Sequence, residues 1–288
     1  MIHVVRGCVL AGIVPVLSTL GSGCGPGPSD ETLVEELRVL AMVAEPPEVA
    51  PGSSSGLSVY VADPEESGGD LLVWTCTNLG EGCLEAAVPG FGATVGSVSG
   101  TPVGATMEVT VPVPAEFEPV VADGVTVLPA LVWALACPIG ECEAIDLARA
   151  APDPTSADGQ ALAALLGDPF GMIGDLPLHG PSLAFQTLGV SLRAAPVTNP
   201  AMTITGSLAE MPVGETVDLR YVVESDDDVT LWGYATGGGF GAPSTAVVNG
   251  EAVLTWYAPE EPAEVTLWVV ATGEAGGSAV WTGVSSVR

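Results

Sequence analysis

The sequence predicts an all-β protein with two tandem β-sandwiches behind an export signal and a partly helical insertion in the first sandwich. Short apolar runs recur along the chain, and Gly, Pro, Asp and Ser separate them. Several of these runs alternate between apolar and polar residues, as strands with one buried face do. Many short strands with turn signals between them are typical of sandwiches.

The composition supports a folded but strongly acidic protein. Hydrophobic residues make up 48% of the 288 residues, which is enough to bury a substantial core. All six basic residues are arginine, and with 35 acidic residues the formal net charge is −29. Such a surface excludes nucleic acid as a partner, because nucleic-acid binding depends on Lys and Arg. It also repels anionic lipid headgroups, so any membrane attachment must be covalent or hydrophobic.

The first 23 residues have the layout of a signal peptide. A short start carries Arg6, residues 9–20 are apolar, and the small residues Gly21, Ser22 and Gly23 follow. The apolar run is too short for a comfortable bilayer span, and Pro15 interrupts it. We therefore expect this segment to be removed after export.

Cys24 follows directly and resembles the acceptor of a bacterial lipoprotein signal, in which a cysteine after small residues receives diacylglycerol. Ser22 and Gly23 fit that pattern, whereas Gly21 stands where Leu is usual and leaves ordinary secretory cleavage open. Five cysteines remain after cleavage, and an odd free thiol is unusual in an oxidising compartment. Lipid on Cys24 would use the odd one, and we interpret residues 24–34 as a tether.

The first sandwich is expected over residues 35–196. Residues 57–61 and 107–111 alternate between apolar and polar side chains. The other strand candidates are residues 37–43, 71–74, 125–137 and 183–194. Residues 144–181 form a Pro- and Gly-rich insertion before the last of these strands. Within it, residues 158–166 contain strong helix formers, with Ser156 or Asp158 as the cap.

The second sandwich is expected over residues 197–288, a length near that of an immunoglobulin-like domain. Its strand candidates are residues 202–205, 217–223, 230–234, 251–257, 265–271 and 279–287. Three segments of the first set have parallels in the second: 57–61 with 217–223, 72–75 with 230–233, and 130–133 with 265–268. The last two parallels carry Trp74, Trp133, Trp232 and Trp268, which we expect in the sandwich cores.

Residues 37–40, 44–52 and 254–259 together look like uncharacterised lipoproteins of myxobacteria and their relatives. Those proteins carry tandem immunoglobulin-like or fibronectin-like domains. The resemblance covers most of residues 35–75 and 199–288. It implies a cell-envelope location, either on the outer membrane or cell surface or facing the periplasm, and it implies no activity.

The remaining cysteines form two sequence pairs, Cys76 with Cys83 and Cys137 with Cys142. Each pair follows a strand that carries a tryptophan. Local pairing is favoured, because Gly80, Gly82 and Gly140 allow tight loops, while a bridge from Cys76 to Cys137 is the long-range option. A zinc site is disfavoured by the spacings and by export.

Three acidic residues, Asp226, Asp227 and Asp228, are weak calcium candidates because they could supply oxygen ligands. They lack the spacing of a calcium-binding loop, and their place between residues 223 and 229 indicates a hairpin turn with solvated acids. Residues 63–70 hold a similar acidic run. Glycines at 237–241 lack the Lys that a phosphate loop needs, so a strand connection is the better interpretation.

No catalytic constellation is recognisable. His179 is the single histidine after residue 23, no G-x-S-x-G motif accompanies it, and there is no Lys for Schiff-base chemistry. We therefore expect no enzymatic activity and no cofactor. The leading hypothesis is a non-catalytic binding or spacer module with a protein or glycan ligand. The alternative is a hydrolase or carbohydrate-active accessory protein that uses the 144–181 loop.

Overall fold

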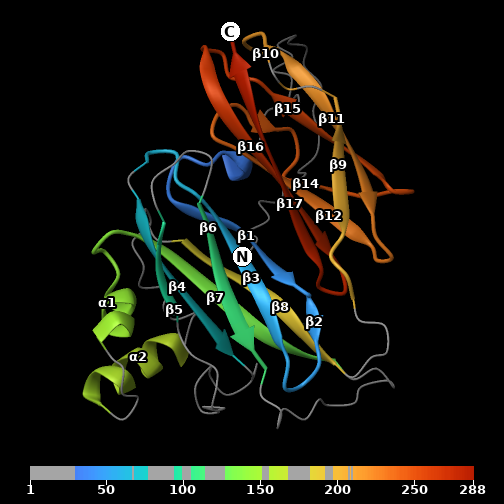
Figure 1. Ribbon diagram of the computed structural model, residues 1–288. Helices are drawn as coiled ribbons and strands as arrows, with labels where there is room; N and C mark the ends of the chain where they lie inside the picture. The colour runs from blue at the N-terminus through green and yellow to red at the C-terminus, as the bar shows by residue number, and fades with distance from the viewer. Residues whose placement is uncertain are drawn as a thin grey trace, which may run out of the picture.

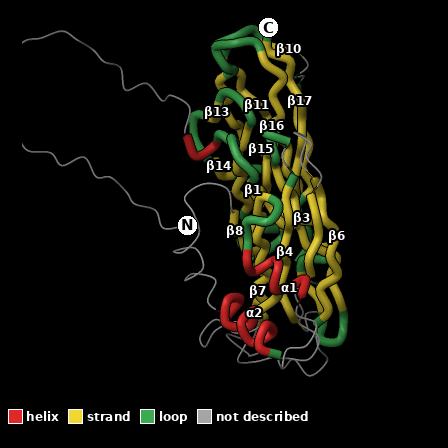
Figure 2. The backbone as a smooth tube through the Cα atoms, turned by 90° about the vertical axis from the view of Figure 1, so that its left-hand side faces the viewer, coloured by secondary structure: helices red, strands yellow, loops and turns green. Residues whose placement is uncertain are grey.

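Strand pairing divides the chain into two sandwiches, each made of two sheets. The computed structural model describes residues 30–66, 68–76, 94–98, 105–113, 127–150, 156–167, 182–191, 197–206, 208 and 210–288. Strands β1 to β8 with helices α1 and α2 form module 1, and strands β9 to β17 form module 2. Figures 1 and 2 show the two modules one beyond the other along a common long axis.

In module 1, one sheet has the strand order β1-β3-β6 and the other has the order β2-β8-β7-β4-β5. The strands are β1 (Arg38–Glu45), β2 (Glu48–Val49), β3 (Ser54–Ala62), β4 (Gly69–Cys76), β5 (Thr94–Val98), β6 (Ala105–Pro112), β7 (Val127–Pro138) and β8 (Ser182–Ser191). Apolar side chains from the two sheets meet in one core that includes Leu57, Val73 and Val132.

In module 2, the sheets have the orders β13-β15-β11-β9 and β10-β17-β16-β12-β14. The strands are β9 (Ala201–Thr205), β10 (Glu210–Met211), β11 (Thr216–Glu224), β12 (Val229–Ala235), β13 (Gly239–Phe240), β14 (Ser244–Ala246), β15 (Glu251–Tyr257), β16 (Ala263–Gly273) and β17 (Ser278–Val287). Trp256, Phe240 and Leu231 are fully buried between them.

The two modules repeat one strand arrangement. Strands β1, β3 and β6 hold the places that β9, β11 and β15 hold in module 2. Strands β2, β8, β7, β4 and β5 likewise correspond in order to β10, β17, β16, β12 and β14. In both modules the first member of this row pairs parallel to the second, whereas the others pair antiparallel. The expected tandem of immunoglobulin-like sandwiches is confirmed, and the three predicted parallels fall on equivalent strands.

The partly helical insertion is also confirmed between β7 and β8. Helix α2 (Ala157–Gly167) covers the predicted helix, and Ser156 caps it, since its Oγ accepts a hydrogen bond of 3.0 Å from the Gly159 N–H. Helix α1 (Glu143–Ala150) was not expected from the sequence. Both helices pack on the outer face of the β4–β7 sheet, where Ile145 and Leu166 are buried.

The expectation that four tryptophans fill the sandwich cores is wrong. Trp74 and Trp133 stack across β4 and β7 with ring centroids 6.1 Å apart, but they lie on the outer face beneath the helices. Trp232 and Trp268 likewise point away from the core of module 2. Alternation along a strand separates two faces without saying which one is interior, and here both faces are apolar.

The turn at residues 226–228 connects the two sheets of module 2 and is not a hairpin. Strand β11 pairs with β9 and β15, whereas β12 pairs with β14 and β16. The glycines at 237–241 are a strand connection, as predicted, and they lead through β13. Gly238 has φ +67°, and a Cβ there would lie 2.0 Å from the Tyr257 carbonyl oxygen. Only glycine allows this close approach.

Gly238→Ala is expected to destabilise module 2 far more than Gly250→Ala. Both residues have positive φ, but a Cβ at Gly250 would meet nothing nearer than the Val223 oxygen at 3.4 Å. Both variants should therefore share the strain of positive φ. Gly238→Ala should lose a further 1–3 kcal/mol or so, because it displaces backbone. Urea unfolding would measure the difference, and equal losses would contradict the assigned close approach.

Candidate functional site

Several of the predicted site residues lie outside the described residues: Cys24, Cys83 and His179. Cys76 is the last residue of β4. Cys137 and Cys142 form a disulfide with their Cα atoms 6.1 Å apart. This bond ties the end of β7 to the start of α1, where the Cys142 carbonyl accepts the Ile145 N–H at 3.1 Å.

An ion pair between a buried carboxylate and a partly exposed arginine holds α1 at its other end. Asp70 on β4 has a side chain only 6% exposed, and it pairs with Arg149 in the last turn of α1. The Ser97 hydroxyl donates a second hydrogen bond to Asp70 over 3.3 Å. The hydrogen bond to Asp70 raises the pKa of the Arg149 guanidinium. The disulfide and the ion pair thus fix α1 as a cover over Trp74 and Trp133.

The acidic run at 226–228 stabilises the turn through hydrogen bonds with backbone groups. Asp227 accepts hydrogen bonds on both carboxylate oxygens, from the Asp228 N–H at 2.9 Å and from the Ala275 N–H in the β16–β17 turn. The Glu274 N–H donates to the Asp228 carbonyl over 2.9 Å. Asp226 and Asp228 are exposed. Among the described residues, no group of three His, Cys, Asp or Glu side chains is placed to hold a metal ion.

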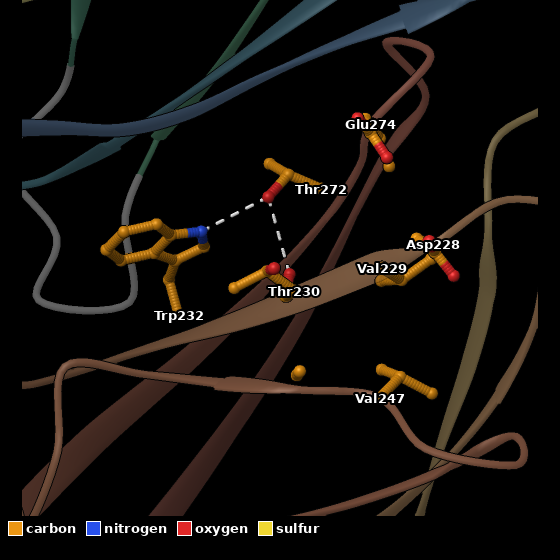
Figure 3. A pocket seen from close by; sticks show the side chains of 9 residues that line it. Asp228, Val229, Thr230, Trp232, Val247, Thr272 and Glu274 are labelled. Carbon is orange, nitrogen blue, oxygen red and sulfur yellow. Dashed lines mark hydrogen bonds between the residues drawn. The ribbon is translucent and has the colours of Figure 1, made fainter.

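An open hollow of about 540 Å³ lies beside this turn, on the outer face of module 2. Figure 3 shows Trp232 at one side, Asp228 and Glu274 at the other, and Thr230 and Thr272 between them. The Trp232 indole N–H donates to the Thr272 hydroxyl at 3.1 Å, and that hydroxyl donates to the Thr230 carbonyl at 3.3 Å. The polar groups of Trp232, Thr272 and Thr230 thus form hydrogen bonds with one another, and they do not pair a nucleophile with a base.

The most developed feature is the junction between the modules. Its apolar centre consists of Val34, Leu40 and Ala62 from the module 1 side and Tyr234, Trp268 and Val280 from module 2. Trp268 is 1% exposed. Leu40 reaches the junction because the register of β1 against β3 shifts at this residue, which turns its side chain away from the core of module 1.

Polar contacts surround this centre. The Arg38 guanidinium lies 5.1 Å from the centroid of the Tyr234 ring. Burial raises the pKa of the Tyr234 hydroxyl, and the charge of Arg38 opposes that effect. Asn199, between the modules, donates to the Ala44 carbonyl and to Glu45 Oε2, each over 2.7 Å. Its own Oδ1 accepts the Ser278 N–H at 2.8 Å.

The chain before β1 enters the same junction. Residues Asp30–Thr32 form a short 3₁₀ helix, η1, and Leu33 bridges to Ala235 of β12. The Val34 N–H donates to the Ala235 carbonyl over 2.8 Å, and the Thr32 hydroxyl accepts the Phe240 N–H over 3.0 Å. Residues 30–34 of the expected tether therefore belong to the folded protein. Sequence reasoning missed the junction because its residues lie up to about 250 positions apart, and no local pattern links them.

No family model and no curated protein matches the chain. A lipoprotein from Bacteroides thetaiotaomicron has a TM-score of 0.27 and 13% identity, over 33% of this chain and 84% of its own. The D00-D0 domain of intimin has a TM-score of 0.27 and 12% identity, over 88% of this chain and 100% of its own. The fibronectin(III)-like modules of Clostridium thermocellum CbhA score 0.26 with 10% identity, over 90% of each chain. TM-scores this low carry no argument about the fold. The assignment of the fold class therefore rests on the strand pairing described above.

None of the helices in the described ranges is long and apolar enough to cross a membrane.

Asp227→Ala should lower the free energy of unfolding by about 1.5–3 kcal/mol, because two backbone N–H groups lose a charged acceptor. Asp226→Ala is the matched control and should change stability by less than about 0.5 kcal/mol, since that residue is exposed. Thermal or urea unfolding without calcium would measure both. A calcium-induced rise in melting temperature that Asp227→Ala abolishes would instead favour a cation site.

Proposed function

We propose that this chain is an exported cell-envelope lipoprotein whose two modules act together as a rigid, non-catalytic spacer or binding platform. The junction carries this proposal. Independent domains on a flexible linker move relative to one another by default. Here the side chains of Val265–Ala271 in β16 are all buried, because one face of the strand packs in its own module and Trp268 on the other face packs against module 1. Two modules joined in this way hold a fixed distance and orientation.

Export and lipid anchoring rest on the sequence. The signal-peptide layout of residues 1–23 and the small residues before Cys24 support cleavage there. Since Cys137 and Cys142 pair with each other, three cysteines remain after residue 23, namely Cys24, Cys76 and Cys83. Local pairing of the last two would leave Cys24 free for lipid. The resemblance to lipoproteins of myxobacteria points the same way.

The net negative charge of the chain limits the classes of partner that it can bind. Residues 24–288 keep five arginines and all 35 acidic residues, so this part of the chain carries a net charge of −30. A surface of that charge repels nucleic acid and anionic headgroups, and a covalent anchor overcomes the second repulsion. The partner we propose is a protein or glycan of the cell envelope, bound without a cofactor.

The described part of the insertion gives no support to the hydrolase alternative. Helices α1 and α2 bury Ile145 and Leu166 against the sheet, and their best-held polar contact is the ion pair of Arg149 with Asp70. A catalytic loop instead presents convergent acids or a histidine to a concave pocket. The buried side chains and the ion pair of these helices instead stabilise the fold of module 1.

Intact-mass spectrometry of the membrane fraction tests the anchor. We expect a species that begins at Cys24 and carries diacylglycerol, together with the mass loss of two disulfides. Cys24→Ala should remove the lipid and shift the protein out of the membrane fraction, because the proposed attachment is the lipid on that cysteine. Cys8→Ala is the matched control and should leave both unchanged, since Cys8 lies in the segment that is removed. A protein cut before Cys24 but carrying an unmodified thiol would contradict lipidation.

A further inference from the structure

We infer that residues 32–34 strap the two modules together, and that the lipid anchor therefore attaches at the junction, with both modules lying alongside the membrane. The first part stands on the structure alone. The second part rests on the proposed lipidation of Cys24.

The strap touches module 2 before it enters module 1. Thr32 is fully buried, and its hydroxyl accepts the N–H of Phe240, a residue in the core of module 2. Val34 is 1% exposed and packs against Trp268, while its N–H donates to the Ala235 carbonyl. Four residues after Val34 the chain begins β1 and pairs with β3 of module 1.

The residues that flank the strap add contacts of their own. The Arg38 guanidinium donates to the Glu31 carbonyl over 3.3 Å and lies against the Tyr234 ring. Residues 31–38 thus provide main-chain, side-chain and cation–π contacts at the junction. Main-chain hydrogen bonds of this kind fix direction as well as distance, so the strap sets the angle between the modules.

The anchor cannot lie far from this point. Five residues lie between Cys24 and Asp30 in the sequence, and the six steps from one to the other span at most about 22 Å when fully extended. The junction must therefore stay within about that distance of the lipid. In Figure 1 the blue start of the described chain lies between the modules, while the C-terminus lies at the far end of module 2 and α2 at the far end of module 1. A protein held at its middle presents its long side to the membrane.

Neutron reflectometry on a supported bilayer tests the orientation. The mature chain, residues 24–288, would be coupled through Cys24 to a maleimide lipid, so that the result does not depend on acylation in the cell. The matched control carries Cys24→Ser and a cysteine appended after Arg288, which attaches the same protein by one end. We expect a thinner protein layer for attachment at Cys24. Equal layers, or a thicker one for Cys24, would overturn the inference even if cellular lipidation is found.

Small-angle X-ray scattering tests the strap in solution. Thr32→Ala leaves the buried Phe240 N–H without its acceptor, and Val34→Asp places a charge against Trp268. We expect both variants to show a larger maximum dimension and a broader distribution of module orientations. Glu35→Ala changes an exposed neighbour and should leave the profile unchanged. Circular dichroism would verify that the sheets persist. A folded Val34→Asp protein with the wild-type profile would overturn the strap.

Discussion

Burial of β16 on both faces is the constraint on which the arrangement of this protein depends. Leu267 and Val269 face the core of module 2, while Trp268 faces module 1. A fully buried tryptophan removes roughly 150–250 Å² from water, which contributes about 4–6 kcal/mol to folding at the usual coefficient, and the contact with module 1 supplies part of that burial. Without module 1, Trp268 would lose the cover of Leu40 and Ala62 and add exposed apolar surface, which folded monomers keep small. Module 2 therefore relies on module 1 to cover this tryptophan, although it has a core of its own.

The same sheet is apolar on its outer face in both modules, yet the two copies cover it differently. Module 1 inserts α1 and α2 between β7 and β8, and these helices cover Trp74 and Trp133. Module 2 joins the equivalent strands β16 and β17 by a short turn and so has no helices there. Module 1 covers the part of this face around Trp268, whereas the hollow beside Trp232 stays open. A duplicated sandwich with two apolar faces needs a third layer in each copy, and here one layer is an insertion while the other is the neighbouring module.

The sequence predicts what is local and periodic. Alternation at residues 57–61, 107–111 and 217–223 predicts strands β3, β6 and β11, and the helix formers after Ser156 predict α2. Three kinds of feature were not predicted from the sequence. Strand β5 reads TVGSV, too short and too rich in small residues to stand out. The prediction that the tryptophans face the sandwich cores is wrong, because a strand buried on both sides has no polar face that would show which side is interior. The junction joins Thr32 to Phe240 and Leu40 to Trp268, and these distances in sequence leave no local signal.

The acidic side chains fall into two groups, those that accept hydrogen bonds within the fold and those that are exposed. Where a carboxylate is buried or turned inward, it meets a named donor: Asp63 accepts the Gly68 N–H at 2.7 Å, Asp70 pairs with Arg149, and Asp227 accepts two backbone N–H groups. These acids stabilise turns and helix placement. The exposed acids have a different effect, since a high negative charge repels headgroups and similar proteins alike. The two roles therefore belong to different acids: the inward carboxylates add to stability through their donors, and the exposed ones set the charge that a partner surface meets.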